Sequence, residues 1–116
     1  MSQQLVNMEK LLTLMEGDVE LIREVFEVFA EEVPQRRDKF ESALSDGDMV
    51  ALMQLAHALK GSSGTLQAEP LRDVSRELEH AAREGRETAA RELVPNLLSL
   101  LDRTAAAMRE EKRRLA

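Results

Sequence analysis

The apolar residues of this chain recur every three or four positions in each segment, which is the spacing of one face of an α-helix. No segment alternates between apolar and polar residues, as a half-buried strand would. At about 100° per residue, one apolar stripe consists of Leu52, Leu55, Leu59 and Leu66, with Ser62 filling the turn between them. The pattern therefore predicts an all-α protein.

Residues typical of helix ends divide this pattern into helical segments. Glycine often closes a helix, aspartate and asparagine often cap the next one, and proline is favoured in a first helical turn. These signals predict a short first helix from about Asn7 to Glu16, a stop and a cap at Gly17-Asp18 and at Gly47-Asp48, a helix opened by Glu69-Pro70 and ended by Gly85, and a last helix from about Glu87.

Two prolines lie inside apolar stripes and bear on the continuity of the long helices. Pro34 is expected to kink or divide the helical arm that carries Phe29 and Phe40. Pro95 is expected to bend the last helix without ending it, because the stripe continues on both sides. Short connections between four long segments imply antiparallel neighbours. We therefore expect an antiparallel up-down four-helix bundle with a short additional N-terminal helix.

The composition is that of a small independent module. The chain has 116 residues, of which 43% are apolar, so residues 1–116 are expected to form a single domain. Because cysteine is absent from the sequence, disulfides, thiolate metal sites and thiol nucleophiles are excluded. The first residues lack the features of a signal peptide, and no window approaches the roughly 18 apolar residues of a membrane span. We expect a cytoplasmic protein that does not enter the membrane.

The formal net charge of -6 argues against nucleic acid as a partner, because phosphate backbones require a basic surface. The aromatic residues are Phe26, Phe29 and Phe40, whose helical spacing places them in the core and not on a base-stacking platform. A zinc site is not expected either. His57 and His80 lie far apart in the sequence, and no carboxylate or thiolate lies at ligand spacing from His57 on its own helix.

The most informative residue is His57, which lies opposite the leucine stripe of its helix. Lys60 falls roughly 60° to one side of it, Gly61 roughly 40° to the other side, and Gly64 almost directly below it, two turns on. Each glycine inside a helix costs about 1 kcal/mol relative to alanine. Two of them below an exposed histidine indicate that something large approaches the ring.

A second interpretation of the glycines stays open at this point. Gly61 can instead end the helix as a left-handed cap, with residues 62–65 forming an ordinary loop. The position of Leu66 argues for a continuous helix, because it extends the apolar stripe beyond Leu59 as though the helix did not stop.

These residues resemble a known family, the histidine-containing phosphotransfer (HPt) domains of bacterial multistep phosphorelays. The resemblance extends over nearly the whole chain, with Gln67 and Ser75 at positions where the family often has glycine and cysteine. It rests on the runs Ala56-His57-Ala58-Leu59-Lys60-Gly61-Ser62-Ser63 and Leu66-Gln67-Ala68, on Leu71, Leu78-Glu79 and Ala82-Arg83, and upstream on Gly17-Asp18, Leu21-Ile22, Phe26, Phe29, Pro34 and Asp46-Gly47-Asp48.

The resemblance implies a phosphoryl carrier. His57 would be the phospho-acceptor, since a neutral imidazole nitrogen is a competent nucleophile, and Lys60 would pair with the phosphoryl oxygens. Glu79 and Arg83 would flank the acceptor, with Glu79 orienting the ring. As an i, i+4 pair of favourable order, Glu79 and Arg83 can alternatively form only a surface ion pair. Gly61 and Gly64 would give the partner access to the ring.

The partners implied are response-regulator receiver domains and a hybrid sensor histidine kinase. The sequence contains no phosphate-cradling loop of the P-loop kind and no acidic triple for magnesium. We therefore expect a carrier and not an enzyme, with no cofactor or metal of its own, with magnesium on the receiver domain, and with a monomeric state.

Two other functions remain as alternatives. The same helical face could belong to an adaptor that binds a partner without chemistry, in which case His57 would be dispensable. It could also belong to a helical enzyme that uses His57 as a general base, although a base needs a pocket and an orienting partner. His80, which lacks glycines below it, is expected to be an ordinary solvated side chain.

Overall fold

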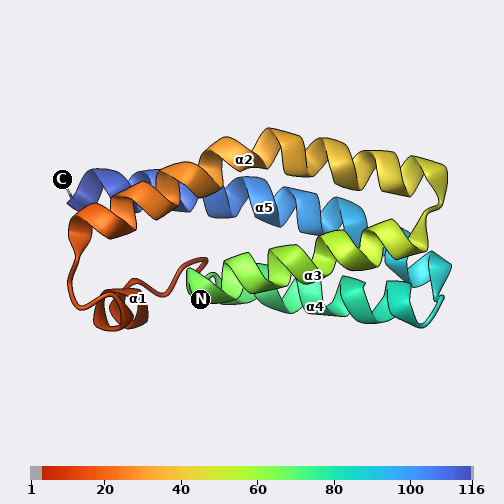
Figure 1. Cartoon of the computed structure of the whole chain (residues 1–116), viewed down its shortest axis with the longest axis horizontal. Coiled ribbons are helices and arrows are strands. Elements are labelled where there is room, and N and C mark those ends of the chain that lie inside the picture. Colours follow the sequence, from red (N-terminus) through yellow and green to blue (C-terminus); the bar gives the residue numbers. More distant parts are fainter. Residues whose placement is uncertain (1–3, 116) are drawn as a thin grey trace.

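The computed structural model describes residues 4–115 and contains five helices in that range. They are α1 (Met8–Leu14), α2 (Val19–Asp46), α3 (Met49–Thr65), α4 (Glu69–Arg83) and α5 (Glu87–Leu115). In Figure 1, α2 and α5 lie side by side along one half of the bundle, and α3 and α4 lie along the other half. The described residues contain no strand. The predicted all-α four-helix bundle with a short additional N-terminal helix is confirmed.

The short helix α1 lies at one end of the bundle (Figure 1). The backbone N–H of Asn7 donates to the carbonyl oxygen of Gln67 at 2.9 Å, which fastens this segment to the connection between α3 and α4. Leu11 is completely buried, so α1 also adds to the core. Within residues 4–115, no helix has both the length and the apolar character needed to cross a membrane.

The predicted helix boundaries at Gly17-Asp18 and Gly47-Asp48 are confirmed. The side chain of Asp18 accepts a hydrogen bond from the backbone N–H of Leu21 at 3.1 Å, and that of Asp48 accepts one from Ala51 at 3.0 Å. Gly47 ends α2 with a φ of 65°, in the left-handed region that favours glycine. These two signals fix the start of α3 and place His57 in the middle of that helix.

Pro34 does not divide the helical arm, so that alternative was wrong. The helix α2 is continuous over 28 residues with Pro34 inside it. Val33 and Phe40 are buried on either side of this exposed proline. Core packing therefore stabilises the helix on both sides of Pro34. This packing compensates for the backbone hydrogen bond that proline cannot donate. Pro95 lies inside α5 in the same way, as expected.

The helix α3 also continues through Gly61 to Thr65, so the interpretation of Gly61 as a left-handed cap was wrong. Gly61 does not have a positive φ, and the buried hydroxyl of Ser63 donates to the carbonyl oxygen of Leu59 at 2.6 Å. The inner face differs slightly from the predicted stripe. Its fully buried residues are Leu52, Ala56, Leu59 and Ser63, while Leu55 and Ser62 are only half-buried at its edge.

Candidate functional site

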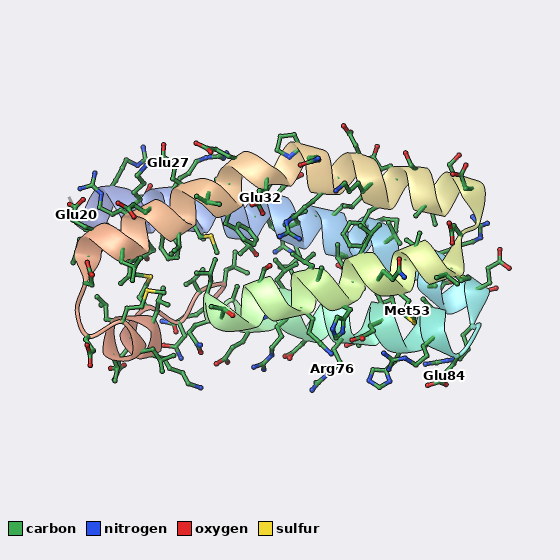
Figure 2. All side chains as sticks on the ribbon, in the orientation of Figure 1. Glu20, Glu27, Glu32, Met53, Arg76 and Glu84 are labelled. Carbon is green, nitrogen blue, oxygen red and sulfur yellow. The ribbon has the colours of Figure 1, made fainter. Side chains whose placement is uncertain are left out.

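His57 lies on the outer face of α3, with 67% of its side chain exposed. The neighbouring residues Ala56 and Leu59 are turned into the core, which leaves the imidazole on the opposite side of the helix. In Figure 2, Met53 of α3 and Arg76 of α4 are labelled, and each lies about one turn from a residue of the site. The predicted exposure of His57 is confirmed.

The side chain that meets His57 is Glu79 of α4, which is almost completely buried. Its Oε2 atom lies 2.7 Å from Nδ1 of His57 and accepts a hydrogen bond from Arg83 at 2.8 Å. Its Oε1 atom lies 2.7 Å from Nζ of Lys60. One carboxylate therefore joins three side chains, two from α3 and one from its own helix.

The charge on Glu79 is stabilised despite its burial. Contact with the Lys60 ammonium is the largest effect and lowers the pKa of Glu79, burial raises it, and the hydrogen bond with His57 lowers it again. Together these effects lower the pKa of Glu79 from 4.5 to about 2. Glu79 is therefore a carboxylate at neutral pH.

This charge state determines which ring nitrogen of His57 carries the proton. An ionised carboxylate can only accept hydrogen bonds, so Nδ1 of His57 must be the donor. In the neutral ring, the proton is then on Nδ1, and Nε2 keeps its lone pair. Because the ring is exposed, the site presents an unprotonated nitrogen to a reacting group from outside.

The predicted site residues Lys60, Glu79 and Arg83 are brought together around His57. The alternative that Glu79 and Arg83 form only a surface ion pair was wrong, because Glu79 is buried and contacts the imidazole as well. With a neutral ring, Lys60 and Arg83 outnumber Glu79 by one charge. The site is thus locally cationic in a chain with a net charge of -6.

The two glycines below His57 lie in different surroundings. A β-carbon at Gly61 would meet nothing within 4 Å, so the surface beside His57 is open there. A β-carbon at Gly64 would lie 3.4 Å from Cδ of Arg72, whose stem crosses α3 at this point. Gly64 therefore provides space for α4 to pack, a role that the sequence interpretation did not assign to it.

The contacts of Lys60 with Glu79 and of Gly64 with Arg72 were also not predicted. Helices α3 and α4 are antiparallel, so a step forward along one matches a step back along the other. From His57 to Gly64 is seven residues forward, and from Glu79 to Arg72 is seven residues back. Pairing glycines of α3 with long side chains of α4 at this offset would have revealed the second contact.

His80, next to Glu79 in the sequence, is exposed, as expected. It lines a groove between α4 and α5 together with Arg76, Glu77 and Arg86. The contacts of Glu79 are with His57, so adjacency in the sequence does not make His80 part of the site.

The chain is similar to known proteins in both sequence and structure. The model of the Hpt domain family matches residues 24–107. The structure is similar to that of histidine-containing phosphotransfer protein B from Pseudomonas aeruginosa, with a TM-score of 0.87, 26% identity, and coverage of 97% of this chain and 98% of the other. It also shares its fold with the HPT domain of a sensor hybrid histidine kinase from Shewanella, with a TM-score of 0.82, 19% identity and 94% of each chain covered.

A curated relative is the signal transduction histidine-protein kinase BarA of Shigella flexneri, 30% identical over 94 residues, which are 81% of this chain. The match covers only 10% of that kinase, so the chain corresponds to a small part of it. Because the family model covers most of the chain, the chain belongs to the Hpt domain family.

Proposed function

We propose that this protein carries a phosphoryl group on His57 and exchanges it reversibly with the aspartate of receiver domains in a phosphorelay. The observation that carries this proposal is the contact between buried Glu79 and Nδ1 of the otherwise exposed His57. It keeps the proton on Nδ1 and leaves the lone pair of Nε2 facing outward.

The transfer step follows from this arrangement. The lone pair of Nε2 attacks the phosphorus atom of the partner's aspartyl phosphate, an N–P bond forms, and the P–O bond to the aspartate breaks. The aspartate carboxylate leaves with the electron pair. No proton has to move, because Nδ1 keeps its proton, and the carboxylate of Glu79 balances the positive charge that the ring acquires. Reversal of the same step returns the phosphoryl group.

Lys60 and Arg83 would be the cations that stabilise the phosphoryl group on His57. Both already pair with Glu79, at 2.7 Å and 2.8 Å, so they are held beside the ring before the group arrives. A charged pair with a phosphoryl oxygen is stronger than a neutral hydrogen bond. Open space at Gly61 would allow a protein surface to approach.

We infer that the protein is a carrier that relies on its partners for catalysis. The proposed partners are response-regulator receiver domains, which would contribute the acidic residues and the magnesium, and a hybrid sensor histidine kinase, the class named for the Shewanella protein whose HPT domain shares this fold. A role as an adaptor without chemistry is less well supported, because it would not require a buried carboxylate to orient an exposed histidine.

The test incubates the purified chain with a panel of phosphorylated receiver domains and magnesium. We expect a label on the chain that is labile in acid and stable in alkali, as phosphohistidine is. His57→Gln should take up no label, whereas the matched variant His80→Gln should be labelled like the wild type. A wild-type chain that stays unlabelled across the panel, or a labelled His57→Gln variant, would overturn the proposal.

A further inference from the structure

The position of His57 depends on how α3 is rotated about its own axis, and burial alone specifies that rotation weakly. Leu52, Ala56 and Leu59 point inward, but apolar residues also lie on the outer side of the helix. Val50 is 61% exposed, and Ala58 is exposed as well. A helix that is apolar on several sides has no single face that must be buried. Polar contacts on its flanks must therefore help to fix its rotation.

On the flank towards α4, the contacts of Glu79 with His57 and Lys60 provide such a constraint. The flank towards α2 is more open. Two grooves of about 500 and 460 Å³ lie along the boundary between α2 and α3, and the contact between these two helices is less extensive than that between the other neighbouring pairs. Gly61 lines one of these grooves together with Glu32 of α2, which is labelled in Figure 2.

Within the described part of the chain, a single side-chain hydrogen bond crosses this boundary, from Arg36 of α2 to Ser62 of α3. The Nη2 atom of Arg36 donates to Oγ of Ser62 at 3.2 Å and to Oε2 of Glu32 at 3.1 Å. Its guanidinium carbon lies 6.0 Å from the centre of the Phe29 ring. Three neighbours from two helices thus fix one guanidinium group. Its partner on α3, Ser62, is next to Gly61 in the sequence and lies more than one turn beyond His57.

The burial of Arg36 has a cost for the stability of the fold. Its side chain is only 20% exposed, and its Nε atom is buried without a hydrogen-bond partner among the described residues. A buried donor without an acceptor costs free energy, which an apolar side chain of similar length would avoid. The guanidinium group is therefore better explained by a role in placing α3 than by its net effect on the fold.

We propose that Arg36 is a positioning residue for phosphotransfer, which through Ser62 fixes the rotation of α3 and hence the direction in which His57 faces a docked receiver domain. This inference rests on the proposed function. A receiver docked on the bundle has a fixed orientation, so a rotated α3 would turn Nε2 away from the phosphoryl group. A small donor such as phosphoramidate approaches from any direction and would not be affected.

The test compares Arg36→Met with Arg37→Met. Arg37 is the matched control, because it also lies on α2 and pairs with an i, i+4 glutamate, but it ties α2 to α5 through Asp102 at 2.8 Å. The receiver domain that labels the wild type fastest serves as donor. We expect Arg36→Met to lower the transfer rate at saturating receiver by roughly tenfold or more, with KM changed by less than about twofold. Arg37→Met should keep the wild-type transfer rate.

Labelling by phosphoramidate should be the same in wild type, Arg36→Met and Arg37→Met to within about twofold. If Arg36→Met does not fold, Ser62→Ala takes its place. Ser62→Thr, which retains a hydroxyl acceptor, should restore transfer. A wild-type rate in folded Arg36→Met, an equal loss in Arg37→Met, or an equal loss with phosphoramidate would each overturn the positioning role. Failure of the proposed function would appear differently, as a wild-type chain that no receiver labels.

Discussion

At the scale of single residues, Glu79 decides where the imidazole of His57 carries its proton. In Glu79→Ala, no carboxylate is left to accept from Nδ1, so the neutral ring should exchange between its two proton positions. We expect the ring ¹⁵N spectrum to show a proton on Nδ1 in the wild type and a mixture in the variant. Phosphoramidate labelling should fall by roughly tenfold.

Glu79→Gln provides the control for this prediction. Its amide oxygen can still accept from Nδ1 while the negative charge is lost. We expect this variant to keep the proton on Nδ1 and to lose less activity than Glu79→Ala. Identical ring spectra for wild type and Glu79→Ala would contradict the assignment of the proton to Nδ1.

Gly61 offers a second test at this scale, in which stability and transfer should change in opposite directions. A β-carbon there would meet nothing within 4 Å, and any residue other than proline favours a helix interior more than glycine does. Gly61→Leu should therefore raise the free energy of unfolding by roughly 0.5–1 kcal/mol, as measured in urea. Transfer from a receiver should fall at least about tenfold, because the leucine occupies the surface over which the partner closes.

The control for Gly61→Leu is Ser45→Leu, which adds the same apolar side chain at an exposed position near the end of α2. It should leave transfer unchanged. If Gly61→Leu transferred at the wild-type rate, the partner would not approach over Gly61.

At the scale of the helix, the continuity of α2 through Pro34 has an energetic consequence. Proline inside a helix removes one backbone hydrogen bond and crowds the preceding turn. Since Pro34 is exposed, replacing it costs no buried contact. Pro34→Ala should therefore raise the free energy of unfolding by about 1–2 kcal/mol, less than the full helix penalty because proline also restricts the unfolded chain. Urea denaturation measures this change, and a lower midpoint in the variant would show that the helix requires the proline.

Helix bounds and inward faces could be predicted from the apolar pattern, whereas contacts between helices could not. The contact of Glu79 with His57 was expected only from the family resemblance. The caps at Asp18 and Asp48 and the exposure of His57 follow from local rules. The contact of Lys60 with Glu79 and the bond from Arg36 to Ser62 depend on which residues two helices bring opposite each other. Periodicity gives the direction of a side chain on its own helix but not the register of the neighbouring helix.

Two residues that depart from the family pattern, Gln67 and Ser75, have unusual surroundings in the structure. Gln67 has a φ of 59°, which is strained for any residue but glycine and explains why glycine is common there. Ser75 is fully buried, with a hydroxyl that lacks a partner among the described residues. The missing partner of the Ser75 hydroxyl could not be obtained from the resemblance alone.

At the scale of the whole molecule, the buried Glu79 makes the free energy of unfolding depend on pH. The unfolded chain binds a proton at this group near pH 4.5, whereas the folded chain resists protonation until its lowered pKa of about 2. As the pH falls between these values, the unfolded state takes up the proton first, so stability decreases. The contribution present above pH 4.5 is of the order of 3 kcal/mol, and it is lost towards pH 2.

Unfolding in urea at several pH values measures this link. Because Glu79→Gln has no proton to bind, its stability should decline less steeply than that of the wild type between pH 4.5 and pH 2. Parallel curves for the two proteins would show that folding does not lower the pKa of Glu79.

Because the donors around Glu79 come from both α3 and α4, the reactive form of the histidine exists only where these helices are correctly paired. A nascent, cleaved or damaged copy would still contain the histidine but would present it with either nitrogen protonated and without its counter-ions. Such copies would be poor competitors for the phosphoryl group. Under the proposed function, assembly of the site from two helices would therefore favour phosphoryl transfer through correctly folded molecules.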